Sequence, residues 1–254
     1  MSKYLFSILA MILTSCVVPN YYQIYNADYE GGKLENNRIV FEDKNCRINY
    51  NLWNLGGNIG FSIYNKTEND ITINLTKTFF VLNGVAYEYF QNRIYSKSSS
   101  VAASSSTSRF PNSRYSSSSS TSTSALSSSY GTAYSEKPML TIPPKTMILI
   151  SEFGIVESRY INCGLMKFPS QRDIKTLSFE KKNSPFVFYN LITYISKGDT
   201  LRLENNFFVS EITNLPESEA FIDIDTSVCG RKLFPPLKTA KNARPDRFYF
   251  QYSE

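Results

Sequence analysis

The side-chain types in this sequence restrict the chemistry that it can perform. The chain of 254 residues contains no histidine. That absence excludes Ser-His-Asp and Cys-His catalysis and removes the commonest ligand of transition metals. The sequence also has no glycine-rich phosphate loop and no CxxC pair, so neither phosphate cradling nor a zinc or redox site is indicated. We therefore predict no cofactor and no metal site.

Paired carboxylates are the one catalytic arrangement left open, because glycosidases need only two acids across a cleft. Five acidic residues are close in sequence near the C-terminus: Glu211, Glu217, Glu219, Asp223 and Asp225. Acids at this density usually form a solvated surface. Asp223 and Asp225 alone would also supply too few oxygen ligands for calcium. We interpret the group as surface residues and predict that the chain is not an enzyme.

A group of aromatic residues is the candidate ligand platform. Trp53, the single tryptophan, would stack on a sugar or a peptide if it were exposed together with Tyr87 and Tyr89. Tyr50 and Tyr64 are further candidates. The alternative, which we favour, is that a lone tryptophan on a strand of a sandwich packs in the core.

The chain is mildly basic, with a formal net charge of +5. Its basic residues form no stripe with interleaved aromatic residues, which an electrostatic footprint for nucleic acid requires. We expect no nucleic-acid partner.

The first fifteen residues have the order of a secretory signal, which is a basic residue at Lys3, an apolar run over 4–13 and then small residues. The run is too short for a permanent membrane span. The following sequence, Leu-Thr-Ser-Cys at 13–16, resembles the lipobox of bacterial lipoproteins. The resemblance implies cleavage before Cys16 and a membrane anchor on its thiol. The alternative is an ordinary signal peptide, 1–15, with an incidental cysteine.

The residues after Cys16 help to predict which membrane would hold the anchored protein. Val17 is not the aspartate that resembles an inner-membrane retention signal, and acidic residues first appear at Asp28 and Glu30, too late to resemble a surface-export signal. We expect a lipid anchor in the outer membrane facing the periplasm, with surface exposure as the alternative. Three cysteines remain, Cys46, Cys163 and Cys229. Because the number is odd, we expect one disulfide and one free thiol, and the sequence does not show which two cysteines pair.

The body of the chain has the pattern of antiparallel strands. Polar and apolar residues alternate over 47–53, 58–64 and 70–75, which is typical of half-buried strands. Asn-Gly at 83–84 separates two strand-like runs and predicts a type I′ hairpin. We predict an all-β fold, an antiparallel β-sandwich, as one domain over 38–254 that follows a lipid-anchored tether over 16–37.

Residues 96–135 differ in kind, because about half of them are serine. We predict a disordered insertion in the domain. The alternative is that its aromatic residues order on a partner: Phe110, Tyr115, Tyr130 and Tyr134.

Beyond the insertion, further strands are expected over 139–142, 146–153, 185–195, 200–203, 207–213 and 247–252. The stretch 229–247 is expected to be extended coil. Weak helical patterns occur over 170–177 and 216–221.

The runs 61–73, 79–84 and 142–145 resemble a layout common in immunoglobulin-like extracytoplasmic domains. The whole chain resembles uncharacterised lipoproteins of Bacteroidetes. This resemblance implies an immunoglobulin-like β-sandwich more than an activity, and Cys16 is the one residue whose role it carries over.

Three hypotheses for function follow. The first is a non-enzymatic structural or protein-interaction module, anchored to the membrane by lipid, with a protein partner in the cell envelope. The alternative is a glycan- or peptide-binding surface lipoprotein, which requires Trp53 or several tyrosines in a groove. The third is an envelope hydrolase with two carboxylates across a pocket.

Overall fold

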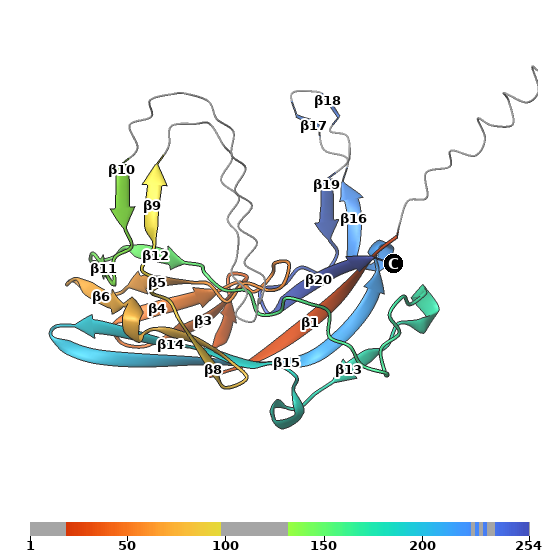
Figure 1. The fold of residues 1–254 in the computed structure, drawn as a ribbon, viewed down its shortest axis with the longest axis horizontal. Helices are drawn as coiled ribbons and strands as arrows, with labels where there is room; N and C mark the ends of the chain where they lie inside the picture. The colour runs from red at the N-terminus through yellow and green to blue at the C-terminus, as the bar shows by residue number, and fades with distance from the viewer. Residues whose placement is uncertain (1–18, 98–131, 225–226, 229–230, 233–236, 254) are drawn as a thin grey trace, which may run out of the picture.

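The computed structural model describes residues 19–97, 132–224, 227–228, 231–232 and 237–253. They form two antiparallel sheets and three two-stranded ladders (Figure 1). Sheet A has nine strands: β1 (Asn20–Glu30), β6 (Ile71–Asn74), β7 (Phe79–Leu82), β8 (Val85–Glu88), β11 (Met139–Ile142), β13 (Thr176–Ser178), β14 (Val187–Ser196), β15 (Asp199–Pro216) and β20 (Arg247–Ser253). Their main order is β11-β6-β14-β15-β1-β20, with β7 paired to β14 and β8, and β13 paired to β15.

Sheet B has the order β12-β5-β4-β3-β2. Its strands are β2 (Lys33–Glu35), β3 (Arg38–Glu42), β4 (Cys46–Tyr50), β5 (Phe61–Asn65) and β12 (Met147–Ile150). The ladders pair β9 (Ile94–Lys97) with β10 (Thr132–Ser135), β16 (Phe221–Ile224) with β19 (Leu237–Ala240), and β17 (Ser227–Val228) with β18 (Arg231–Lys232). The helical turns are η1 (Leu75–Lys77), η2 (Gln171–Asp173), η3 (Lys181–Asn183) and α2 (Glu217–Ala220).

An aromatic core joins the two sheets. The ring of Tyr50 on sheet B lies 5.1 Å from that of Phe207 on sheet A, in an edge-to-face contact. Phe41 also contacts Phe207, at 5.5 Å. The buried Tyr50 hydroxyl donates to Asn205 Oδ1 at 2.8 Å, which satisfies a polar group that would be costly if left unpaired. The sheets therefore pack as a sandwich, and the prediction of an all-β antiparallel fold is confirmed.

Local turn chemistry was also predicted correctly. Asn83 and Gly84 have φ angles of 49° and 83° between β7 and β8, as a type I′ turn requires. The strand expected over 247–252 is β20. The separate strands expected over 200–203 and 207–213 are parts of one strand, β15, of 18 residues. The weak helical pattern over 216–221 corresponds to the single turn α2.

The predicted tether is wrong over most of its length. β1 lies inside sheet A and pairs with β15 on one side and β20 on the other. Tyr25 on β1 is fully buried and stacks on Phe248 at 4.6 Å. The segment resembles a tether because both of its faces mix polar and apolar side chains, with Gln23 buried and Ile24 facing outward, so the alternation in hydropathy is weak. The folded domain therefore includes β1 and does not start at residue 38.

Two other expectations change in part. The stretch expected as coil over 229–247 contains β18 and β19, whose partners are β17 and β16. The ends of the serine-rich insertion pair with each other as β9 and β10, and residues 98–131, which include Phe110 and Tyr115, lie outside the described residues. In the part of the chain that the structure describes, no helix is long and apolar enough to cross a membrane.

Candidate functional site

The site begins at a β-bulge in the longest strand. Before the bulge, Asn205, Phe207 and Val209 of β15 are buried; after it, Ile212 and Asn214 are buried. The buried positions of β15 change from odd to even residue numbers because the register with β1 shifts between Asn26 and Ala27.

The bulge places consecutive side chains on the outer face of sheet A, which is a common use of bulges near functional sites. Ser210 donates to Asp28 Oδ1 at 3.1 Å, and the neighbouring Glu211 accepts a hydrogen bond from Asn26. The extra residue in β15 therefore places the side chains of Ser210 and Glu211 next to each other on the outer face of sheet A.

Cross-strand register assembles the rest of the site. Asn26 is the partner of Glu211 on β15 and of Arg247 on β20, so these residues form one row across three strands. Neighbouring strands are about 4.8 Å apart, which puts the Cα atoms of Glu211 and Arg247 roughly 10 Å apart with Asn26 between them. In the next row, the Thr213 hydroxyl lies 2.7 Å from that of Thr176.

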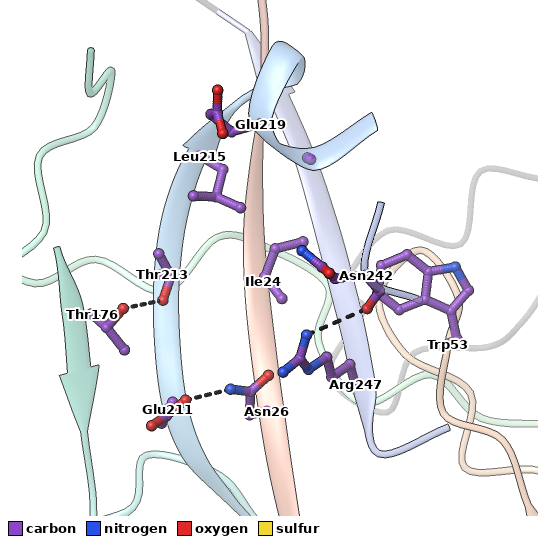
Figure 2. Close-up of a pocket in the computed structure, with 11 residues that line it drawn as sticks. Ile24, Asn26, Trp53, Thr176, Glu211, Thr213, Leu215, Glu219, Asn242 and Arg247 are labelled. Carbon is purple, nitrogen blue, oxygen red and sulfur yellow. Dashed lines mark hydrogen bonds between the residues drawn. The ribbon is translucent and has the colours of Figure 1, made fainter. Parts of the chain in front are cut away.

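These rows form the floor of a cavity of about 220 Å³. Figure 2 shows the side chains that surround it. Its lining is Ile24, Asn26, Trp53, Thr176, Glu211, Thr213, Leu215, Glu219, Ala220, Asn242 and Arg247. A second hollow of about 440 Å³ shares Asn26, Glu211 and Arg247 with it and is also lined by Asp28, Ser210, Arg244 and Asp246. We call the two together the sheet A groove.

Trp53 reaches the rim of the groove from the loop after β4. That loop covers the free edge of β20, because Tyr249 N–H donates to Asn54 O at 3.2 Å and Gly56 N–H donates to Tyr249 O at 2.7 Å. The half-buried indole of Trp53 lies 5.1 Å from the Tyr249 ring. Burial raises the pKa of Tyr249, so the ring that Trp53 contacts is neutral at physiological pH.

The groove holds charges that no ion pair uses. Among the described residues, neither Glu211 nor Arg247 lies in an ion pair, whereas Arg244 pairs with Asp246 at 2.5 Å. Arg247 makes one long hydrogen bond, 3.4 Å, to the carbonyl of Asn242. Asn26 Oδ1 and Asp246 Oδ1 are buried acceptors with no partner in this structure. Buried polar groups are normally satisfied, so these two atoms are exceptions beside the groove.

Two acidic residues of the predicted group line the cavity, and they lie far apart. Glu211 and Glu219 both line the cavity, but Figure 2 shows them at opposite ends of it, with Leu215 between. The strand from Glu211 to Leu215 alone spans roughly 13 Å, more than the about 5 to 10 Å between paired carboxylates in glycosidases.

The other acids of the predicted group have different surroundings. Glu217 accepts a hydrogen bond from Tyr22 and pairs with Lys238. Asp223 is exposed on β16, and Asp225 lies outside the described residues.

The predicted aromatic platform does not assemble. Tyr89 is a core residue, 2% exposed, and its hydroxyl donates to Asn190. Tyr87 is half-buried, and Tyr87 and Tyr89 both contact Phe153, whereas Trp53 contacts Tyr249. The favoured core placement of Trp53 is also inaccurate, since its indole lines the groove.

The cysteines do not contribute to the groove. Cys46 is buried and Cys163 is exposed, and both are free thiols, so no disulfide joins these two. Burial, and then the Asp43 carboxylate, raise the pKa of the Cys46 thiol, which makes it unreactive. Cys16 and Cys229 lie outside the described residues.

Asn26 and Arg247 were missed as site residues. Asn26 lies in the segment interpreted as a tether, and Arg247 gives no local signal beyond opening the expected last strand. Only the register of β1 with both neighbours brings them together.

The described residues contain no cluster of three or more potential metal-binding side chains. No protein family, curated protein or solved structure matches the chain.

Proposed function

We propose that this chain is a lipid-anchored, non-enzymatic lipoprotein of the cell envelope that binds another envelope component through the sheet A groove. The observation that carries the proposal is the row of Glu211, Asn26 and Arg247. A carboxylate and a guanidinium that are half-buried but not ion-paired are poised for an external partner, because burying them unpaired has a cost that a partner removes.

The anchor rests on the lipobox resemblance at Cys16, and the outer membrane, with the domain facing the periplasm, is the proposed location. The non-enzymatic part rests on the missing histidine and on the separation of Glu211 from Glu219. A protein is the first candidate for the partner, as an envelope interaction module would require.

A glycan is the second candidate, and a specific observation favours it. Trp53 offers an indole in the same cavity that Glu211 and Arg247 line. Sugar hydroxyls donate and accept, so one ring can serve both Glu211 and Arg247 without carrying net charge. An extended peptide that adds a strand is disfavoured, because the edge of β20 is already covered.

The test is a pull-down of the full-length protein from the native envelope in mild detergent. The groove variant carries Glu211→Gln and Arg247→Gln, and the matched control carries Glu204→Gln and Arg38→Gln at exposed positions of β15 and β3. Bound proteins are identified by mass spectrometry and bound carbohydrate by composition analysis. We expect at least one component to be retained by wild type and control and to fall by tenfold or so with the groove variant. Equal retention by all three proteins would contradict the proposal.

A further inference from the structure

An aromatic cluster closes the end of sheet A where the described chain begins and ends. Tyr21 on β1 and Tyr252 on β20 are cross-strand partners, with rings 5.9 Å apart. Phe168 packs on both, at 5.0 Å from Tyr21 and 6.2 Å from Tyr252. Figure 1 shows the start of β1 and the end of β20 together at this end of the molecule.

Basic side chains surround the cluster. The guanidinium of Arg159 lies 5.2 Å from the centre of the Tyr252 ring, and the ammonium of Lys167 lies 4.3 Å from that of Phe168. Residues 158–175 contain four basic residues against the single acid Asp173. This segment therefore carries a net positive charge.

Apolar side chains project beside the basic ones. Ile161 is 77% exposed and Met166 is 53% exposed, on either side of the buried Leu165. Both side chains are therefore free to contact another surface.

The segment that carries Ile161 and Met166 is fixed to the sheet. Asn214 donates to the carbonyl of Met166 at 2.8 Å, and the Tyr252 hydroxyl donates to the carbonyl of Lys167 at 2.6 Å. Gln23 donates to the carbonyl of Tyr160 at 3.0 Å. Hydrogen bonds from sheet A therefore fix the backbone that carries these exposed side chains.

The length of chain before β1 determines what this surface can reach. Asn20 opens β1, only four residues after Cys16, and four residues span at most about 14 Å when fully extended. A lipid on Cys16 would therefore hold the Tyr21 end of sheet A next to the bilayer.

We propose that residues 158–168, together with Tyr21 and Tyr252, form a membrane-docking surface that rests on the lipid headgroups around the anchor. Aromatic rings with basic and apolar side chains are the composition that favours the bilayer interface, and the positive charge complements anionic headgroups. The inference rests on the proposed anchor at Cys16. It adds that the domain is oriented on the membrane rather than merely tethered to it.

Methionine oxidation tests the docking surface directly. The lipidated full-length protein is placed in vesicles of phosphatidylethanolamine and phosphatidylglycerol, and a chain beginning at Val17 is kept in solution as the reference. Both are treated with chloramine-T, and sulfoxide formation at Met166 is followed by mass spectrometry relative to Met147. Met147 is the internal control because it is 66% exposed on β12 of sheet B.

We expect the ratio of Met166 to Met147 oxidation to fall about fivefold or more in the vesicles. Lys167→Glu should return it towards the solution value, since each basic residue near an anionic surface changes binding about fivefold. An unchanged ratio in vesicles that do carry the lipidated protein overturns the docking surface and leaves the anchor intact. The anchor itself fails if Cys16→Ser leaves incorporation of labelled palmitate in cells unchanged.

Discussion

Arg93 connects two nearly buried carboxylates at the base of the β9–β10 ladder. Its guanidinium lies 2.7 Å from Glu136 and 2.7 Å from Glu152, whose side chains are 8% and 12% exposed. Burial raises the pKa of Glu136, but hydrogen bonds from Arg93 and from backbone N–H groups outweigh burial and hold this pKa below its ordinary value. The Glu136 carboxylate is therefore ionised and paired in the folded protein.

This pairing makes stability depend on pH. Because the pKa of Glu136 is lower in the folded than in the unfolded chain, its contribution is complete above the ordinary value of 4.5 and is lost as the pH falls through the folded pKa. We expect Glu136→Gln to lower the free energy of unfolding by about 1–3 kcal/mol at pH 7. The difference from wild type should shrink at low pH, where both side chains are neutral.

Urea unfolding at neutral and acid pH measures this effect, with Glu204→Gln as the exposed control. A destabilisation of equal size at both pH values would show that the Glu136 charge is not what stabilises the base of the ladder.

At the scale of elements, the features that can be predicted from the sequence are those that a local pattern of residues determines. The Asn83-Gly84 turn carries its own conformational signal, and the alternation in β4 and β6 is visible in hydropathy. The bulge at Ser210 has no such signal, since it is defined only by the pairing of β15 with β1. For the same reason Trp53 and Glu211 could be named as candidates from residue type, but their association with Asn26 and Arg247 could not.

The loop that carries Trp53 depends on a glycine. Gly57 has a φ of +76°, and a Cβ there would lie 2.8 Å from Ile155 Cδ1 and 3.0 Å from Phe248 Cγ. Gly31 has the same φ, but a Cβ there would meet nothing within 4 Å. Alanine substitutions at the two positions therefore separate the stability cost of backbone strain from that of overpacking.

We expect Gly31→Ala to cost about 1–2 kcal/mol of stability, from strain alone. Gly57→Ala adds overpacking of the core and should cost about 2–5 kcal/mol. Chemical denaturation of both variants measures the difference. Equal costs would mean that the Trp53 loop is not packed on Phe248 as described.

At the scale of the whole molecule, β1 is the element that closes the domain. It joins β20 to the rest of sheet A and supplies Asn26 to the groove and Tyr21 to the proposed docking surface. A boundary at residue 38, as expected from sequence, would remove all three contributions. The strand has no clear signal in the sequence, because the outer face of β1 lines the groove and mixes polar with apolar side chains.

Truncation tests this role of β1. A chain that begins at Pro19 should unfold cooperatively at the same temperature as a chain beginning at Val17, whereas one that begins at Gly31 should show no cooperative transition. Thermal unfolding followed by circular dichroism distinguishes the two. A cooperative transition in the shorter chain would place β1 outside the structural domain.

Photo-crosslinking in living cells tests most directly the proposal that this protein contacts its envelope partner through the sheet A groove. A photoreactive amino acid replaces Thr176, which is exposed at the groove, or Thr141, an exposed threonine on β11 at the far edge of the same sheet. We expect a discrete crosslinked species from position 176 that is lost with Glu211→Gln and Arg247→Gln, and none from position 141. Crosslinking from 141 but not from 176 would contradict it.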